Sequence, residues 1–292
     1  MFDPTAVLNA VAAGVLLGGF YAAIALGIAI AFGMLDIPNL AHPAFVVVGA
    51  FATWVLNTAF GIDPVIAGII LTPLFFGLGI GLYRLYEACF ERRGEAALQG
   101  LAFFFGILFI TEVVLVLTAG ADYRSVDAPY IGASLNIFGL LLPGRMLMAC
   151  AVSLVMIFGL QYYLGHSFIG RAIQAVSQDR LALRLMGVSP VRIKALAFGI
   201  AIATASVAGS LLIIVEPVEP SIGRDFIGRA FAAVVLGGMG SFNGMLIASI
   251  FLGITESIVS DMWNPSWAPA IAFGVLLPTL ALRGGGLLGR KL

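Results

Sequence analysis

Long apolar stretches alternate with short polar segments along the whole chain. Eight of these stretches approach or exceed the length of about 20 residues that a helix needs to cross a bilayer. They cover residues 6–33, 43–60, 65–83, 101–119, 137–163, 195–215, 244–260 and 268–282. The pattern predicts an all-α polytopic membrane protein with about eight transmembrane helices, in which 1–292 forms a single transmembrane domain.

The distribution of charge orients these predicted spans. Eleven of the fifteen Lys and Arg residues lie in loop 84–95, in the polar segment 170–194 and in the C-terminal tail. Because cytoplasmic loops carry an excess of Lys and Arg, we expect these segments and the C-terminus in the cytoplasm and the N-terminus outside. The first apolar run follows no basic residue and is too long for the core of a signal peptide, so it should be a retained span.

A shorter apolar stretch, 226–238, runs into the glycine-rich segment 237–244. Its flanks 216–225 and 261–267 both belong outside, so the chain between them must enter and return. We expect a short helix over 226–236, a break and a longer helix, with the break either re-entrant or a cytoplasmic turn. Irregular backbone at membrane depth must be buried in protein or line a wet path. The resulting candidates for a translocation path are Gly237, Gly238, Gly240, Ser241 and Asn243.

The composition narrows the possible functions. Charged residues make up only 10% of the chain, against about 25% in soluble domains. The formal net charge is zero, so no nucleic-acid partner is favoured. Two histidines, and two cysteines without metal-ligand spacing, predict neither a catalytic nor a metal site. Neither lysine, Lys194 or Lys291, stands in a P-loop, so any ATP must be bound by another chain.

Four polar side chains within the apolar part of the chain are further candidates for the path. Asn39 and His42 lie beside two prolines that interrupt a helix, where they could bond freed backbone groups or contact a substrate. Glu112 and Glu256 fall inside predicted spans, where a charge costs a few kcal/mol, so both should face the protein interior. Each is either a group on the substrate path or a protonated carboxyl that bridges helices. No basic partner for them stands out in the sequence.

The polar segment 170–194 carries helix-capping residues. Ser177 as N-cap, Asp179 in the first turn and Gly187 at C′ predict a helix over Gln178–Met186. At 1.5 Å per residue, this helix is about 13 Å long. Ser189 and Pro190 then begin the next span.

This predicted helix presents Arg180 and Arg184 on one edge, with apolar residues elsewhere. A capped amphipathic helix between two spans can dock into a groove of a partner protein. It can equally lie among lipid headgroups, with its arginines in the polar layer. The residues alone leave both interpretations open.

Several motifs extend over the chain in a fixed order. They are Gly18-Gly-Phe20-Tyr21 with Gly27, Asn39-Leu-Ala-His42 with Gly49-Ala50, the polar segment 170–194, Gly237-Gly-Met-Gly240-Ser241 with Gly244 and Glu256, and Gly286-Leu-Leu-Gly289. Together they resemble the permeases of ABC importers for branched-chain (hydrophobic) amino acids, in length the shorter of two paralogues. Pro43 and Ala44 depart from the Gly and acid that the family commonly has there, which puts strict branched-chain specificity in doubt.

The resemblance implies a permease domain whose cytoplasmic coupling loop, 166–194, contacts an ATPase. The coupling residues would be Arg171, Ser177, Asp179, Arg180, Arg184 and Gly187. It also implies a paralogous permease, two cytosolic ATPases that bind the ATP, a periplasmic solute-binding protein and a bacterial inner-membrane location. The alternative is a secondary transporter or channel for a small solute, which would pair membrane carboxylates with a basic residue and work as a single chain.

Overall fold

The computed structural model describes residues 4–91, 96–137, 140–267 and, beyond these, 270, 271, 274, 277 and 278. Its elements are α1 (Pro4–Ala31), α2 (His42–Phe60), α3 (Pro64–Cys89), α4 (Ala96–Ala119), β1 (Ser134–Ile137), β2 (Leu140–Pro143), α5 (Gly144–His166), α6 (Phe168–Gln178), α7 (Arg180–Leu185), α8 (Pro190–Val215), α9 (Gly223–Gly237), α10 (Phe242–Met262) and a 3₁₀ turn, η2 (Pro265–Trp267).

Within the described residues, seven helices are long and apolar enough to cross a membrane: α1, α2, α3, α4, α5, α8 and α10. They correspond to the first seven predicted spans, and they confirm a polytopic, mostly helical membrane protein. The predicted eighth span, 268–282, lies almost entirely outside the described residues. The helix α9 has 15 residues, about 22 Å, and is shorter than the ~30 Å hydrocarbon core.

The start predicted for the fifth span is wrong, and the fold is not purely helical. The strands β1 and β2 pair in antiparallel fashion, with Ser134 opposite Pro143. The helix α5 begins only at Gly144, whose amide donates to the Ala133 carbonyl (2.7 Å). Pro143 disfavours helical backbone in the residue before it, so the apolar run 140–142 continues as a strand.

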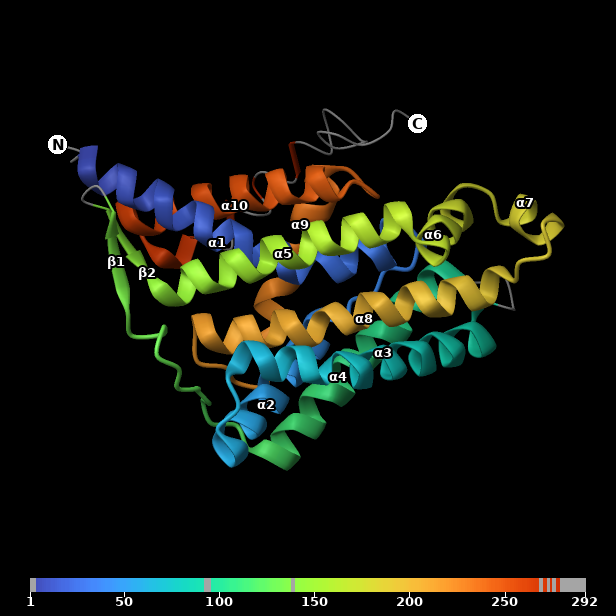
Figure 1. Ribbon diagram of the computed structural model, residues 1–292, viewed down its shortest axis with the longest axis horizontal. Helices are drawn as coiled ribbons and strands as arrows, with labels where there is room; N and C mark the ends of the chain where they lie inside the picture. Colours follow the sequence, from blue (N-terminus) through green and yellow to red (C-terminus); the bar gives the residue numbers. More distant parts are fainter. Residues whose placement is uncertain are drawn as a thin grey trace.

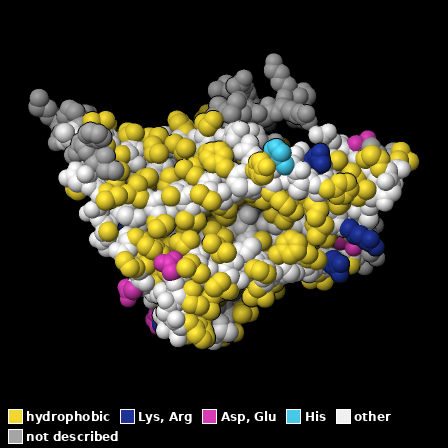
Figure 2. Space-filling model, in the orientation of Figure 1, with side chains coloured by type: hydrophobic (Ala, Val, Ile, Leu, Met, Phe, Trp, Pro, Cys, Tyr) yellow, Lys and Arg dark blue, Asp and Glu magenta, His cyan; other side chains and the backbone are white. Residues whose placement is uncertain are grey.

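The long helices run along the longest axis of the molecule (Figure 1). The N-terminus and the β1–β2 hairpin lie at one end, and α6 and α7 lie at the other. On the face shown in Figure 2, hydrophobic side chains cover the middle, and Lys and Arg side chains gather at the end that carries α6 and α7. The fold therefore separates the same two groups of segments that the charge distribution separates in the sequence.

Glycines allow the closest helix contacts. A Cβ at Gly14 would lie 2.5 Å from the Ile254 Cα, and one at Gly18 would lie 2.4 Å from the Ile250 Cα. These contacts bring α1 against α10 along much of their length, antiparallel to each other. In lipid, helix association depends on such close packing of small residues. The same contact positions Tyr21 of α1 beside Glu256 of α10, which is used below.

Candidate functional site

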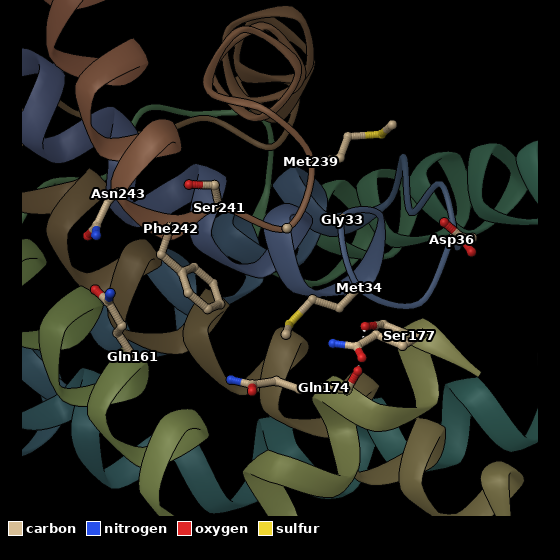
Figure 3. A pocket seen from close by; sticks show the side chains of 12 residues that line it. Gly33, Met34, Asp36, Gln161, Gln174, Ser177, Met239, Ser241, Phe242 and Asn243 are labelled. Atoms are coloured by element: carbon tan, nitrogen blue, oxygen red, sulfur yellow. Dashed lines mark hydrogen bonds between the residues drawn. The ribbon is translucent and has the colours of Figure 1, made fainter. Parts of the chain in front are cut away.

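A polar cavity of about 500 Å³ lies at the end of the bundle that carries α6 (Figure 3). We call it the amide pocket, because neutral amide and hydroxyl side chains dominate its lining and Asp36 is its one charged residue among those described. It is lined by Gly33, Met34, Asp36, Gln161, Gln174, Ser177, Gln178, Met239, Gly240, Ser241, Phe242 and Asn243. Gln161 of α5 and Asn243 of α10 face each other beside the Phe242 ring, and the Gln161 Oε1 is buried without a hydrogen-bond partner.

The turn between α9 and α10 forms one wall of the amide pocket. Gly238 (φ 94°) and Gly240 (φ 82°) adopt left-handed backbone conformations that glycine tolerates best. The Ser241 Oγ accepts from the Gly244 amide at 3.1 Å and caps α10. Because of this cap, the helix resumes at Phe242, and the break covers 238–241 rather than the predicted 237–244. Gly240 and Ser241 line the pocket, while Gly237 ends α9.

The helix predicted over Gln178–Met186 is found in part: α7 covers Arg180–Leu185, whereas Gln178 ends the preceding helix α6, and Ser177 is not an N-cap. Ser177 lies in the last turn of α6, where its Oγ donates to the Gln174 carbonyl (2.7 Å). Asp179 has extended backbone (φ −149°) and separates α6 from α7. The helix α6 lies before the predicted start because its apolar face, which includes the buried residues Ala172, Ile173 and Val176, packs onto the bundle.

The exit from α7 agrees with the prediction. Gly187 has φ 77°, and its amide donates to the Arg184 carbonyl (3.0 Å). Ser189 and Pro190 then begin α8 as expected. Leu185 and Met186 are exposed by 82% and 68%. We call residues 168–187, which hold α6, α7 and the exit at Gly187, the α6–α7 unit. Apolar side chains project from its tip, alongside the exposed Arg184 and, further back, Arg171.

A buried ion pair connects this end of α8 to α3. The Lys194 ammonium bonds the Glu91 carboxylate, and the Tyr83 hydroxyl donates to the other oxygen of that carboxylate (2.8 Å). Only 4% of the Lys194 side chain is exposed. A buried pair of this kind is strongly destabilising to break, so a displacement at the start of α8 should carry α3 with it.

A second polar cavity, about 370 Å³, lies towards the opposite end, between α1, α5, α9 and the end of α8. We call it the charged pocket. Its charged lining residues are Arg145, Glu216 and Arg229, and its other lining residues are Leu17, Phe20, Tyr21, Met146, Val215, Pro217 and Phe226.

Glu256 lies behind the wall of the charged pocket, where it pairs with two lining residues, Arg229 and Tyr21. Both of its carboxylate oxygens accept from the Arg229 Nε (3.1 and 3.2 Å), and Oε2 also accepts from the Tyr21 hydroxyl (2.6 Å). The Glu256 side chain is 2% exposed and the Arg229 side chain 15%. The Arg229 guanidinium also lies 5.6 Å from the Tyr21 ring and 5.5 Å from the Phe226 ring, a cation–π arrangement. The arginine is thereby fixed in one orientation.

Glu216, directly after α8, is the acidic member of the charged pocket. Burial raises the pKa of its carboxyl above the ordinary range, although the nearby Arg229 acts in the opposite direction. Among the described residues, the Glu216 carboxyl has no hydrogen-bonded or ion-paired partner. The pocket thus presents a partly buried acid and a fixed guanidinium.

The expectation that Glu112 and Glu256 lack basic partners is wrong. Glu256 pairs with Arg229, and Glu112 accepts two hydrogen bonds from Arg224, at 2.9 and 2.7 Å. Both arginines belong to α9, the short helix. The sequence held a signal in Arg224, at the end of the external flank 216–225, and in Arg229, in the segment that enters and returns, but their contacts depend on where α9 packs.

The remaining path candidates lie at the break between α1 and α2. The Asn39 Oδ1 accepts from the Ala41 amide (3.1 Å), which is the backbone role considered above. His42 is fully buried and lies so close to α1 that a Cβ at Gly27 would be 2.1 Å from its ring. Neither residue lines the amide pocket or the charged pocket.

Comparison with known proteins identifies the family. The family described as "Branched-chain amino acid transport system / permease component" matches residues 10–280. The high-affinity branched-chain amino acid transport system permease protein BraD of Pseudomonas aeruginosa is 28% identical over 295 residues, covering 95% of this chain and 94% of that protein. LivH of Escherichia coli K12 is 29% identical over 291 residues, with the same coverage.

The high-affinity branched-chain amino acid transport system permease protein LivM of Escherichia coli K12 is 33% identical over 138 residues, which are 42% of this chain and 32% of LivM. The chain is thus similar to LivH along nearly its whole length and to LivM over a shorter stretch. No solved structure gives a significant match. With seven apolar helices and a match over 10–280, the chain belongs to the permease family of branched-chain amino acid transport systems, a family of transporter subunits rather than enzymes.

Proposed function

We propose that this chain is the membrane permease subunit of an ABC importer for hydrophobic, branched-chain or closely related amino acids. A paralogous permease would complete the path, two cytosolic ATPases would bind ATP, and a periplasmic binding protein would deliver the solute. The α6–α7 unit and the amide pocket would face the cytoplasm and the charged pocket the outside of a bacterial inner membrane, with the C-terminus inside and the N-terminus outside.

The observation that carries this proposal is the α6–α7 unit. It projects from the end of the bundle (Figure 1) with the apolar side chains of Leu185 and Met186 exposed at its tip. Apolar side chains exposed in water mark a surface that contacts another protein or a membrane. We assign ATPase coupling to this unit, which contains all six predicted coupling residues: Arg171, Ser177, Asp179, Arg180, Arg184 and Gly187.

The contacts of the α6–α7 unit connect it directly to the amide pocket of the proposed translocation path. Ser177 and Gln174 belong to α6 and also line the amide pocket, so a shift of α6 changes the shape of that pocket. A shift of α7 reaches α8 through Gly187 and the Ser189–Pro190 junction, and it reaches α3 through the Lys194–Glu91 pair. ATP-driven movement of this loop would thereby bias a two-state bundle between its open and closed forms.

The rival function, a secondary transporter, is tested by comparing uptake by the complete complex with uptake by this chain alone. The carboxylate–arginine pairs of α9 occur in this chain, so they no longer separate the two classes. We expect proteoliposomes with the complete complex to take up labelled leucine only with ATP inside and loaded binding protein outside. Gradient-driven uptake by this chain alone would establish the rival function.

Coupling itself is tested at Gly187. Its φ of 77° is unfavourable for valine, and a β-branched residue there costs about 1–3 kcal/mol. No atom lies within 4 Å of a Cβ at this position, so the strain is confined to the backbone. Gly187→Val and Arg184→Glu should lower uptake about tenfold or more with normal membrane insertion. Gly187→Asn, which tolerates left-handed backbone, is the matched control. Undisturbed ATPase coupling in Gly187→Val contradicts the assignment.

A further inference from the structure

We propose that the charged pocket binds a zwitterionic amino acid, with Arg229 facing its carboxylate, Glu216 facing its ammonium group and the apolar wall surrounding its side chain. This inference rests on the proposed transport function and adds the place and the chemistry of recognition. Four features of the pocket carry it: the free donors of Arg229, the unpaired carboxylate of Glu216, the presence of both signs of charge and the apolar wall.

Arg229 is arranged to receive a carboxylate. Its Nε is bonded to Glu256 and its Nη1 donates to the Asp225 carbonyl (3.1 Å). Its Nη2 has no hydrogen-bond partner among the described residues. Because the guanidinium is already fixed between Tyr21, Phe226 and Glu256, a ligand carboxylate meets oriented donors and little side-chain entropy is lost on binding.

Glu216 complements this donor with an acceptor. It follows α8 directly, lines the same cavity and lacks an ion pair of its own in the described part of the chain. A partly buried carboxylate without a partner is unfavourable, and an ammonium group would supply the missing charge. Arg145, exposed at the rim of the pocket, adds positive charge near the entrance.

Both signs of charge in the pocket favour a zwitterion over a simple acid or amine. Arg145 and Arg229 lie with Glu216 in the lining, and Glu256 behind the wall and Asp225 of α9 add negative charge nearby. A zwitterion satisfies both kinds of group. A ligand with one charge leaves either Glu216 or the arginines desolvated without compensation.

The apolar wall fits an aliphatic or aromatic side chain. Leu17, Phe20, Met146, Val215 and Phe226 all line the cavity. Its volume of about 370 Å³ falls at the small end of the usual range of about 300–1,000 Å³ for ligand pockets. A cavity of this size suits a single amino acid and excludes long peptides.

The test uses the complete reconstituted complex and labelled leucine, with loaded binding protein at saturation. Glu216→Gln removes the partner of the ammonium group and should reduce uptake about tenfold, the scale of one charged hydrogen bond, with ATP hydrolysis retained. Glu219→Gln is the matched control: Glu219 lies three residues away, accepts from the Ser221 hydroxyl (2.6 Å) and is not a lining residue of the pocket. It should transport like the unmodified protein.

The outcomes separate this inference from the proposed function. Equal uptake by Glu216→Gln, Glu219→Gln and the unmodified complex overturns the pocket assignment and leaves the importer intact. Failure of the unmodified complex to transport leucine with ATP overturns both. If Glu216→Gln lowers the amount of folded complex, Glu216→Asp provides the second variant. It keeps the carboxylate, and it should recover part of the uptake at equal complex concentration if the charge binds substrate, and none if the pocket is structural only.

Discussion

The two polar pockets differ in the kind of group that they offer a solute. The charged pocket presents opposite charges fixed by a buried network of Tyr21, Arg229 and Glu256. The amide pocket presents neutral amides and hydroxyls, with Asp36 as its single charged lining residue in the described chain. Fixed charges hold a zwitterion by charge-assisted hydrogen bonds, whereas neutral polar groups give weaker and replaceable contacts. The difference suits the proposed one-way path, with recognition at the charged pocket and release at the amide pocket.

The two pockets also differ in what holds them together. The charged pocket depends on a single buried acid, Glu256, while the amide pocket is assembled from helix ends and turns such as the glycine turn 238–241. Among the described residues, none that lines the charged pocket belongs to α6, whereas Gln174, Ser177 and Gln178 of α6 line the amide pocket. We therefore expect recognition to be insensitive to the coupling loop and release to depend on it.

The largest effect should come from removing Glu256. Glu256→Leu leaves Arg229 buried without its partner, which costs about 3–5 kcal/mol, a large share of a typical stability of 5–15 kcal/mol. Thermal unfolding of the purified complex in detergent should show a marked fall in the midpoint. The double variant Glu256→Leu/Arg229→Leu removes both charges and should regain most of the stability without regaining leucine uptake. A double variant that transports normally would remove the contrast between the two pockets.

A substitution in the amide pocket shows how far the stability of that pocket depends on a buried polar group. Gln161→Leu removes an amide whose Oε1 is buried without a partner, so no satisfied hydrogen bond through that oxygen is lost. We expect a change in stability below about 1 kcal/mol, again measured by thermal unfolding. Destabilisation as large as that of Glu256→Leu would show that the amide pocket is equally dependent on a buried polar group.

The smallest effect is expected from pH. Burial raises the pKa of Glu216, so its carboxyl takes up a proton at a higher pH than an exposed glutamate. The charged groups that face it are Arg229 and Asp225 of α9 and Arg145 of α5. Above the raised pKa the carboxylate is charged and can bind an ammonium group, and below it uptake should fall several-fold. The pH profile of uptake by Glu216→Gln should lack this step, and an unchanged profile would contradict the role of Glu216.

The sequence predicted most of the helices because crossing a bilayer needs long apolar runs, a requirement that is local and strong. The signals of Gly187, Ser189 and Pro190 were also local, and the structure confirms the left-handed Gly187 and the start of α8 at Pro190, although the Ser189 side chain makes no capping hydrogen bond. The hairpin at 134–143 was missed because apolarity alone does not distinguish a strand from a helix. Ser177 was assigned to the wrong helix end because the buried face of α6, which extends the helix past it, is set by packing on α5 and α8.

The sites were less predictable than the helices. The glycine turn could be located because glycine allows left-handed backbone, and three of its members, Met239, Gly240 and Ser241, line the amide pocket. The partners of Glu112 and Glu256 could not be located, because they depend on the placement of α9 against α1, α4 and α10. Glu216 was seen in the sequence only as one acid of an external segment. Its importance depends on a cavity that four elements build together.

Site-directed labelling tests the difference between the two pockets most directly. In a complex whose permease lacks Cys89 and Cys150, one variant carries Met146→Cys in the charged pocket and the other Met239→Cys in the amide pocket. We predict that leucine slows maleimide labelling at position 146 much more than at position 239. Analogues of leucine that lack the ammonium or the carboxylate group should not protect position 146. Equal protection at both positions, or equal protection of position 146 by these analogues, would contradict the account.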